Sequence, residues 1–288
     1  MKLSQKTFLR WLQINTYRKY QQNYFLQSAI TQKKPQLKIT LPESMPFMNL
    51  IKEGSDNSNN AIDIPIVDKG KGWVCVEKPG GISIHNEPGK DLISLLKKQI
   101  ADTIRGRLIQ PVHRLDKETS GLLLLALDQK TLARLSALFA SGKVKKKYKA
   151  LVHGNFDMSK PAQTNAWEFP LSKQSGGRSN PGGKGKKVTA HTRYTVIKQT
   201  PHYALLDITL LTGRKHQIRR HAKMSGHPIA GDTRYSSARA IAFLREKRGF
   251  TGMGLHSYFL EFNDNGQTVT LELKTLPLSM EKLLNEDR

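Results

Sequence analysis

Two hydrophobic periods alternate along the chain, one typical of strands and one typical of helices. The run GLLLLAL at 121–127 is continuously apolar, which predicts a strand that is covered on both faces, and WVCVEKP at 73–79 predicts another that ends at Pro79-Gly80-Gly81. Further strands are predicted at 147–152, 188–197, 203–211 and 268–273. These strands are short, as expected for a folded sheet protein.

Two segments have helical spacing. DLISLLKKQI at 91–100 begins with Asp91, a suitable N-cap, and places Leu92, Leu95, Leu96 and Ile100 on one stripe. A second helix is predicted from Asp128 as N-cap to Gly142, with an inward stripe of Leu132, Leu135, Leu138 and Phe139. Because strands outnumber helices and are unevenly interrupted by them, the pattern favours an α+β fold around a mixed or antiparallel sheet.

The domain boundary is predicted near residue 61. The segment KEGSDNSNNA at 52–61 is polar and turn-rich, which is typical of a linker, and compact α/β material begins at Ile62. The 288 residues therefore divide into an N-terminal extension, 1–61, and one large domain, 62–288. We expect a monomer.

The net charge of the chain indicates that it binds a polyanion. The formal net charge is +24, and the first acidic residue is Glu43. Aromatic residues interleave with the basic ones before it, which suits an RNA-binding arm, although a helix packed on the main domain and an organellar transit peptide are also consistent. No apolar run is long enough to span a membrane, and the lone cysteine, Cys75, lies in a predicted strand, so the sequence fits a reducing cytoplasm.

A glycine-rich basic insert lies at 172–187. It resembles a phosphate-binding loop only superficially, because Gly183 and not lysine follows Gly182, and Lys187 precedes Val188 and not serine or threonine. A mobile basic loop near RNA and a plain surface loop both fit this composition. The lysines at 143, 145, 146, 147 and 149 similarly fit either a solvated strand edge or a track for phosphates.

The candidate chemistry narrows to one aspartate. His216 and His221 are five positions apart, which separates them around a helix, and no clustered carboxylates accompany them, so we expect no metal. Paired carboxylates of the glycosidase type and a nucleophile elbow are also missing from the sequence. Asp116, in HRLDKETSG directly before the apolar strand, remains as a nucleophile or base that an arginine would hold.

The basic segment GRKHQIRRHAKMSG supplies candidates for that arginine. If a helix begins at Arg214 and ends near Gly226, then Arg214 and Ile218 share one face and point to the active site. The remaining basic residues would then turn toward phosphates: Arg219, Arg220 and Lys223.

These segments together resemble the RluA-type RNA pseudouridine synthases. The resemblance rests on the ordered set EKPGGISIH, HRLDKETSG, KKKYKALVHG, GRKHQIRRHAKMSGHPIAGDTRY and GLHSYFLEF, and it covers the chain from about Ile62 onward. It implies isomerisation of uridine to pseudouridine in ribosomal or transfer RNA, with base flipping and without cofactor. The N-terminal S4 domain that some members carry is not recognisable in residues 1–60.

The resemblance also implies roles for five residues. Asp116 matches the catalytic aspartate, Arg214 the arginine that pairs with it, and Tyr148 the tyrosine that stacks on the base. Ile218 matches the aliphatic residue on the other side of the base, and Arg114 the arginine that enters the RNA where the base was. Whether Asp116 attacks the sugar, attacks the nucleobase or acts as a base stays open.

Simpler roles remain for several of these residues. Asp116 could be a structural ion pair, Tyr148 a core residue, and Asp232 part of a turn, while His113, His216 and His221 suit a hydrogen-bonding scaffold, with His113 also a candidate RNA contact. A non-catalytic RNA-binding or ribosome-assembly protein on the same scaffold is the alternative function, and DNA binding has only charge in its favour.

Overall fold

The computed structural model describes residues 62–288 apart from 101–107 and 158–164. A compact unit spans Asp63–Arg288. The predictions made for the N-terminal extension and its linker lie outside the described residues. None of the described helices is both long enough and apolar enough to cross a membrane.

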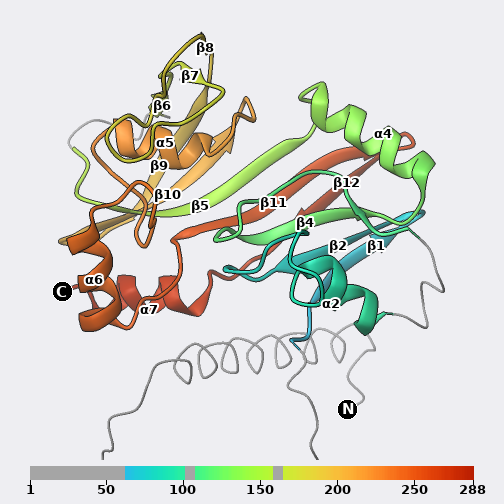
Figure 1. Cartoon of the computed structure of the whole chain (residues 1–288), viewed down its shortest axis with the longest axis horizontal. Coiled ribbons are helices and arrows are strands. Elements are labelled where there is room, and N and C mark those ends of the chain that lie inside the picture. The colour runs from blue at the N-terminus through green and yellow to red at the C-terminus, as the bar shows by residue number, and fades with distance from the viewer. Residues whose placement is uncertain (1–61, 101–107, 158–164) are drawn as a thin grey trace, which may run out of the picture. The chain divides into compact units, whose positions relative to one another are not determined.

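A large mixed sheet forms the centre of this unit (Figure 1). Its strands are β1 (Ile66–Gly70), β2 (Trp73–Lys78), β3 (Gln110–Pro111), β4 (Ser120–Ala126), β5 (Lys145–His153), β6 (Asn165–Trp167), β9 (Thr192–Gln199), β10 (Tyr203–Leu210), β11 (Leu255–Asp264) and β12 (Gln267–Glu272). They follow the order β1-β2-β4-β11-β5-β10-β9-β6, with β12 beside β11 and β3 beside β4. Among the described strands, β11 and β4 pair in parallel and the other pairs of this sheet are antiparallel. The predicted α+β class is confirmed.

Helices flank the sheet at several places. They are α2 (Leu92–Gln99), α4 (Gln129–Ala140), α5 (Gln217–Met224), α6 (Ala238–Arg248) and α7 (Leu278–Glu286). The two predicted N-caps are confirmed, since Asp91 accepts a hydrogen bond from the Ser94 amide and Asp128 accepts one from the Thr131 amide, each at 2.8 Å. These bonds satisfy amide groups that have no partner within the first helical turn.

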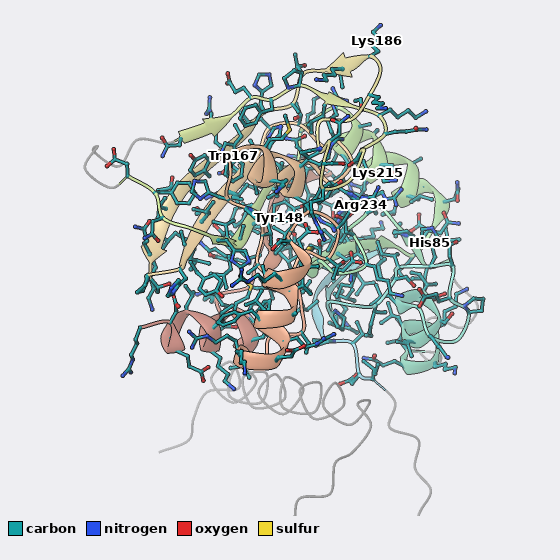
Figure 2. All side chains as sticks on the ribbon, turned by 60° about the vertical axis from the view of Figure 1, so that its left-hand side comes forward. His85, Tyr148, Trp167, Lys186, Lys215 and Arg234 are labelled. Atoms are coloured by element: carbon teal, nitrogen blue, oxygen red, sulfur yellow. The ribbon has the colours of Figure 1, made fainter. Side chains whose placement is uncertain are left out.

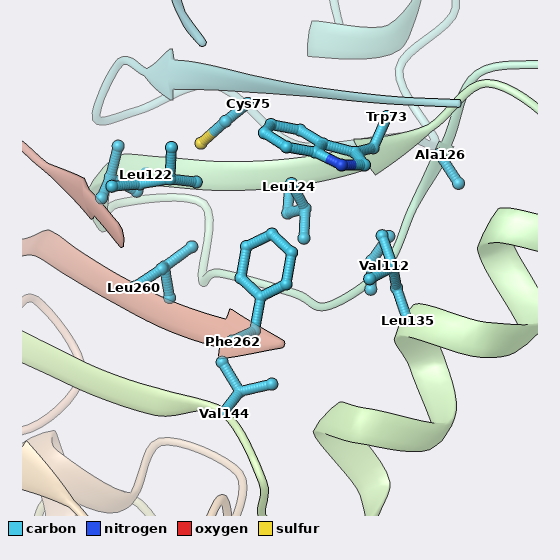
Figure 3. Close-up of a cluster of buried hydrophobic side chains, with 11 residues drawn as sticks. Trp73, Cys75, Val112, Leu122, Leu124, Ala126, Leu135, Val144, Leu260 and Phe262 are labelled. Carbon is cyan, nitrogen blue, oxygen red and sulfur yellow. The ribbon is translucent and has the colours of Figure 1, made fainter. Parts of the chain in front are cut away.

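The apolar run at 121–127 is buried on both faces, as predicted. Leu122 and Leu124 join Trp73, Cys75 and Phe262 in a core cluster against α4 (Figure 3). The alternate residues Leu123 and Leu125 are also fully buried, and they face the opposite side of the sheet. This double burial makes β4 a rigid support for the loop that precedes it.

One predicted strand is wrong in its extent. The segment 188–197 divides into β9 and a short strand β8 (Lys187–Val188), and β8 pairs with β7 (Leu171–Ser172) in a separate two-stranded sheet. Between β8 and β9 the backbone amide of His191 bonds to a side chain and not to a neighbouring strand: it donates to Thr212 Oγ1 at 2.9 Å. The remaining predicted strands are confirmed to within a few residues.

Candidate active site

Asp116 lies in the loop that joins β3 to β4. Its own carbonyl accepts a hydrogen bond from the Thr119 amide at 3.1 Å, and the next carbonyl, that of Lys117, accepts from the Gly81 amide at 2.8 Å. The buried ammonium of Lys78 donates to the same Lys117 carbonyl at 2.9 Å. The segments after β2 and before β4 are therefore bonded to each other, and Asp116 is presented from a fixed backbone.

A buried arginine holds the Asp116 carboxylate. Arg219 Nη1 donates to Asp116 Oδ2 at 2.9 Å, while Arg219 Nε and Nη2 form a two-pronged pair with Asp232 at 2.8 and 2.9 Å. Burial alone would lower the pKa of Arg219, but the hydrogen bonds and charges of Asp232 and Asp116 more than offset it, so that pKa is raised. Asp232, predicted as structural, thus orients the arginine that orients Asp116.

The prediction that Arg214 pairs with Asp116 is corrected by these contacts. Arg214 precedes α5, is exposed, and its Nε donates to the Thr189 carbonyl at 3.3 Å. The helix begins only at Gln217, because His216 has a left-handed φ of 52° and the Gln217 side chain accepts the Arg214 amide at 2.9 Å. This later start turns Arg219, and not Arg214, toward Asp116.

Tyr148 and Ile218 approach the site from different elements. Tyr148 lies on β5 between Ile208 of β10 and Ser257 of β11, and Ile218 lies on α5. Both side chains are largely buried, and both line the same cavity as Asp116. Burial raises the pKa of Tyr148 to about 12, with the charge of Asp116 adding to the effect, so its phenol stays protonated near neutrality.

The cavity has a volume of about 680 Å³, within the range of roughly 300–1,000 Å³ typical of small-ligand sites. Arg114, His113 and the exposed Arg214 line it as well. Figure 2 shows Tyr148 within the body of the molecule, whereas Lys186, beside β8, projects from its edge. Most of the residues predicted for the site therefore meet at one cavity, although they come from segments far apart in the sequence.

Two histidines at this cavity differ in their contacts. His113 Nε2 accepts the Leu124 amide at 3.0 Å and its ring stacks on Phe139, and burial lowers its pKa to about 3. His216 Nε2 lies 3.5 Å from Asp116 Oδ1, and its Nδ1 lies 3.0 Å from the Tyr235 hydroxyl. His113 thus has the scaffold contacts that were predicted, and its predicted contact with RNA stays a prediction. The proximity of His216 to Asp116 had no signal in the sequence beyond its place in the basic segment.

The prediction that Arg219 and Arg220 face phosphates is also corrected. Both are buried, and Arg220 donates to the carbonyls of Ser172 at 3.0 Å and Gly182 at 2.8 Å. These bonds tie Ser172 and Gly182, the start and an interior residue of the insert 172–187, to α5, which the prediction of a mobile loop did not anticipate. Lys223 is half-buried on α5, and its predicted contact with RNA stays a prediction.

The arrangement suits chemistry on a neutral, flat group attached to an anionic chain. One carboxylate faces a cavity that has an aromatic side chain on one element and an aliphatic side chain on another. Basic side chains also line this cavity. A flat nucleobase could lie between Tyr148 and Ile218 while Asp116 contacts the atom to which the nucleobase is attached. Stacking of the nucleobase on the Tyr148 ring would contribute about 1–3 kcal/mol.

Similar proteins are known. Residues 72–224 match the family described as RNA pseudouridylate synthase. The chain is 34% identical over 205 residues to ribosomal large subunit pseudouridine synthase C of Vibrio vulnificus, which covers 69% of this chain and 61% of that protein. It is 31% identical over 216 residues to tRNA pseudouridine synthase C of Haemophilus ducreyi, which covers 70% of this chain and 86% of that protein.

Solved structures share the fold. Human RNA pseudouridylate synthase domain containing 4 has a TM-score of 0.61 at 25% identity, over 76% of this chain and 91% of that one. Human RNA pseudouridylate synthase domain containing 1 has a TM-score of 0.63 at 22% identity, over 78% of this chain and 89% of that one.

Proposed function

Because the chain belongs to the RNA pseudouridylate synthase family, we propose that it isomerises uridine to pseudouridine in RNA, with Asp116 as the catalytic carboxylate. The observation that carries this proposal is the position of Asp116, held by Arg219 at the cavity that Tyr148 and Ile218 also line. The family relatives act, by their names, on ribosomal and transfer RNA, so we take these two RNA classes as the candidate substrates.

The reaction requires a bond to break, a base to turn and a new bond to form. The bond between uracil N1 and ribose C1′ breaks, and the bonding electrons go to N1. If Asp116 is the nucleophile, the ester that it forms with C1′ breaks when uracil C5 bonds to C1′; if it is the base, the proton that it takes from ribose C2′ returns there when C5 bonds to C1′. Between the two steps the uracil rotates, and afterwards the C5 proton leaves and N1 gains a proton. Contacts within the cavity would keep the detached uracil beside the ribose, which gives it a high effective concentration for the second step.

Tyr148 and Ile218 would hold the uracil through that rotation. A uridine in a folded RNA must first leave its stack, at a cost of a few kcal/mol, and contacts with these two side chains offset part of it. The phenol of Tyr148 stays protonated near neutral pH, because burial raises its pKa to about 12, and it can therefore donate a hydrogen bond. Arg114 would contact the RNA that surrounds the extruded nucleotide, a role that its exposure and its place in the cavity lining support.

The test is the activity of Asp116→Asn on unmodified transcripts of large-subunit ribosomal RNA and transfer RNA. With uridine tritiated at C5, each conversion releases tritium to water, so the parent protein should release it and Asp116→Asn should not. Asp68→Asn, a change of the same kind on the exposed strand β1, is the matched control and should keep the parent rate. RNA affinity should be nearly equal in all three proteins. Release by Asp116→Asn at the parent rate would remove Asp116 from catalysis.

The RNA substrate itself is tested separately. A map of pseudouridine in cells with and without this gene should show at least one position that depends on it. The RNA that contains this position would be the substrate. A map with no lost position, together with an inactive parent protein, would favour the non-catalytic RNA-binding alternative.

A further inference from the structure

The lysines of β5 divide between the two faces of the sheet. Successive side chains of a strand point to opposite faces, so Lys146 shares the face of Tyr148, whereas Lys145, Lys147 and Lys149 share the other. Lys146 lines the cavity that contains Asp116, and its three neighbours do not. The basic run at 145–149 therefore contains one lysine that lines the cavity and three that do not.

The three lysines on the far face already have partners within the protein. Lys149 Nζ donates to Asp207 Oδ1 at 3.1 Å and lies 4.3 Å from the centre of the Tyr258 ring. Lys147 Nζ lies 5.2 Å from the centre of the Phe259 ring, and Lys145 Nζ lies 3.8 Å from Glu261 Oε1. Carboxylates and aromatic faces thus account for these charges.

Lys146 is different. Within the described part of the chain, no carboxylate or hydrogen-bond acceptor lies within bonding distance of its ammonium, although the side chain is half-buried and burial lowers its pKa. Its Nζ lies close to the backbone at Gly213, where a Cβ atom would be 3.8 Å away. A partly desolvated cation without a partner is unfavourable, which indicates that an anion completes the site.

The charge of the cavity indicates what that anion is. Five arginine or lysine side chains line it, but a single carboxylate, that of Asp116, does so among the described residues. Arg219 is bonded to Asp116 and Asp232, which leaves Arg114, Lys146, Arg214 and Lys215 without a carboxylate among the described residues. Uracil and ribose are neutral, so the phosphodiester is the anionic group that a target nucleotide brings.

We propose that Lys146 binds a backbone phosphate next to the target uridine, and so positions the ribose over Asp116. This inference rests on the proposed function. Lys146 and Tyr148 are two residues apart on a strand, about 7 Å at the usual rise, so a base against Tyr148 leaves a phosphate of the same nucleotide within reach of Lys146. Because β5 is paired with β10 on one side and β11 on the other, this contact is more rigid than those from the exposed Arg114 and Lys215.

Lys146→Met and Lys147→Met form a matched pair, because the same change is made on opposite faces of one strand. The measurements are the affinity of the full chain for a transcript containing the target uridine, over a series of salt concentrations, and the rate of tritium release. For Lys146→Met we expect the slope of log affinity against log salt to fall by about 0.7–0.9, the value for one lost phosphate contact. We expect Lys147→Met to keep the parent slope and rate, and Lys146→Arg to restore most of what Lys146→Met loses.

A change in the RNA tests the same contact without altering the protein. Each of the two phosphates flanking the target uridine is replaced in turn by a neutral methylphosphonate. At one of them the parent should lose affinity, and Lys146→Met should lose little more there. Lys146→Met could have a folding defect, which would be visible as a lower unfolding temperature. The parent protein with altered RNA still tests the phosphate contact in that case, because its own folding is unchanged.

Equal salt slopes and rates for Lys146→Met and Lys147→Met would overturn the inference while an active parent leaves the proposed function standing. Equal affinity losses in parent and Lys146→Met at both phosphates would overturn it in the same way. A parent that converts no uridine in any transcript would overturn the proposed function and this inference with it.

Discussion

Arg219→Lys keeps a positive charge at the centre of the site but removes the planar fork that holds two carboxylates at once. The guanidinium makes three hydrogen bonds to carboxylate oxygens, two to Asp232 and one to Asp116, at 2.8–2.9 Å. A lysine has one nitrogen on a flexible stem, so it can reach one carboxylate well and not both. Asp232, fully buried, or Asp116 then loses its charged partner.

The expected loss of stability follows from the bonds that disappear. Two charge-assisted hydrogen bonds, at about 1.5 kcal/mol each, correspond to a loss of about 3 kcal/mol in the free energy of unfolding. In a domain of this size, the unfolding temperature should fall by about 6–12 °C. Catalysis should fall further, by about 100-fold in kcat, because a carboxylate displaced by about 1 Å loses its alignment with the reacting atom.

Arg214→Lys is the control, since it makes the same change at the arginine that the sequence favoured. Arg214 is exposed and donates to a backbone carbonyl, so the cost should be below about 0.5 kcal/mol. Thermal unfolding followed by circular dichroism and tritium release from C5-labelled RNA measure the two effects. If Arg219→Lys unfolds at the parent temperature, or if Arg214→Lys is the variant that loses activity, then the pairing of Arg219 with Asp116 does not do what we infer.

Three further predictions concern the fold around the site. Gly121→Ala should destabilise the protein strongly, because Gly121 has a φ of 108° and a Cβ there would lie 2.1 Å from the Ser257 carbonyl oxygen. Gly142→Ala, at a φ of 72° with open space around it, should lower the free energy of unfolding by only about 1–2 kcal/mol. Equal chemical denaturation midpoints for the two variants would contradict this. Burial lowers the pKa of His256 to about 3, and that of His113 likewise, so each binds a proton in the unfolded state, at an ordinary pKa of 6.5, that it does not bind in the folded state; each should therefore lower the stability by about 2 kcal/mol between pH 7 and pH 5. His256→Gln should remove its own share of that loss, about 2 kcal/mol, and leave the share of His113, and an unchanged slope would assign the loss to other groups. Burial raises the pKa of the Cys75 thiol, so a disulfide reagent should label it only as fast as the domain opens, and rapid labelling of the native protein would show that β2 is accessible.

Local patterns in the sequence determined much of the fold. The helix caps at Asp91 and Asp128 depend on a side chain and an amide three residues away, so they are encoded within one turn. The doubly buried strand β4 is visible as an unbroken apolar run, because both of its faces need hydrocarbon. The position of Asp116 directly before that strand, and its resemblance to a family motif, pointed to the reactive carboxylate.

The partner of Asp116 depended on a contact between residues 103 positions apart. In the segment TGRKHQIRR, the sequence favoured Arg214 over Arg219 and Arg220, because we expected the helix to begin at Arg214, whereas α5 begins at Gln217. The left-handed φ of His216 and the hydrogen bonds of Gln217 mark that start, and the bonds of Gln217 join it to Thr212 and to Thr192 of β9. Because α5 begins at Gln217 and not at Arg214, Arg219 is buried against Asp116 and Arg214 is exposed.

Lys146 shows the same division. Alternation along β5 places Lys146 and Tyr148 on one face and Lys147 on the other, although the strand predicted from the sequence began only at residue 147. Which face holds the cavity, and which holds Asp207 and Phe259, was decided by the order of strands in the sheet and by the elements packed on it. The sequence by itself determined the local periods and the residues available for chemistry. Only the tertiary structure decided their pairing, because hydrogen bonds and charge contacts act over a few ångströms in space and not along the chain.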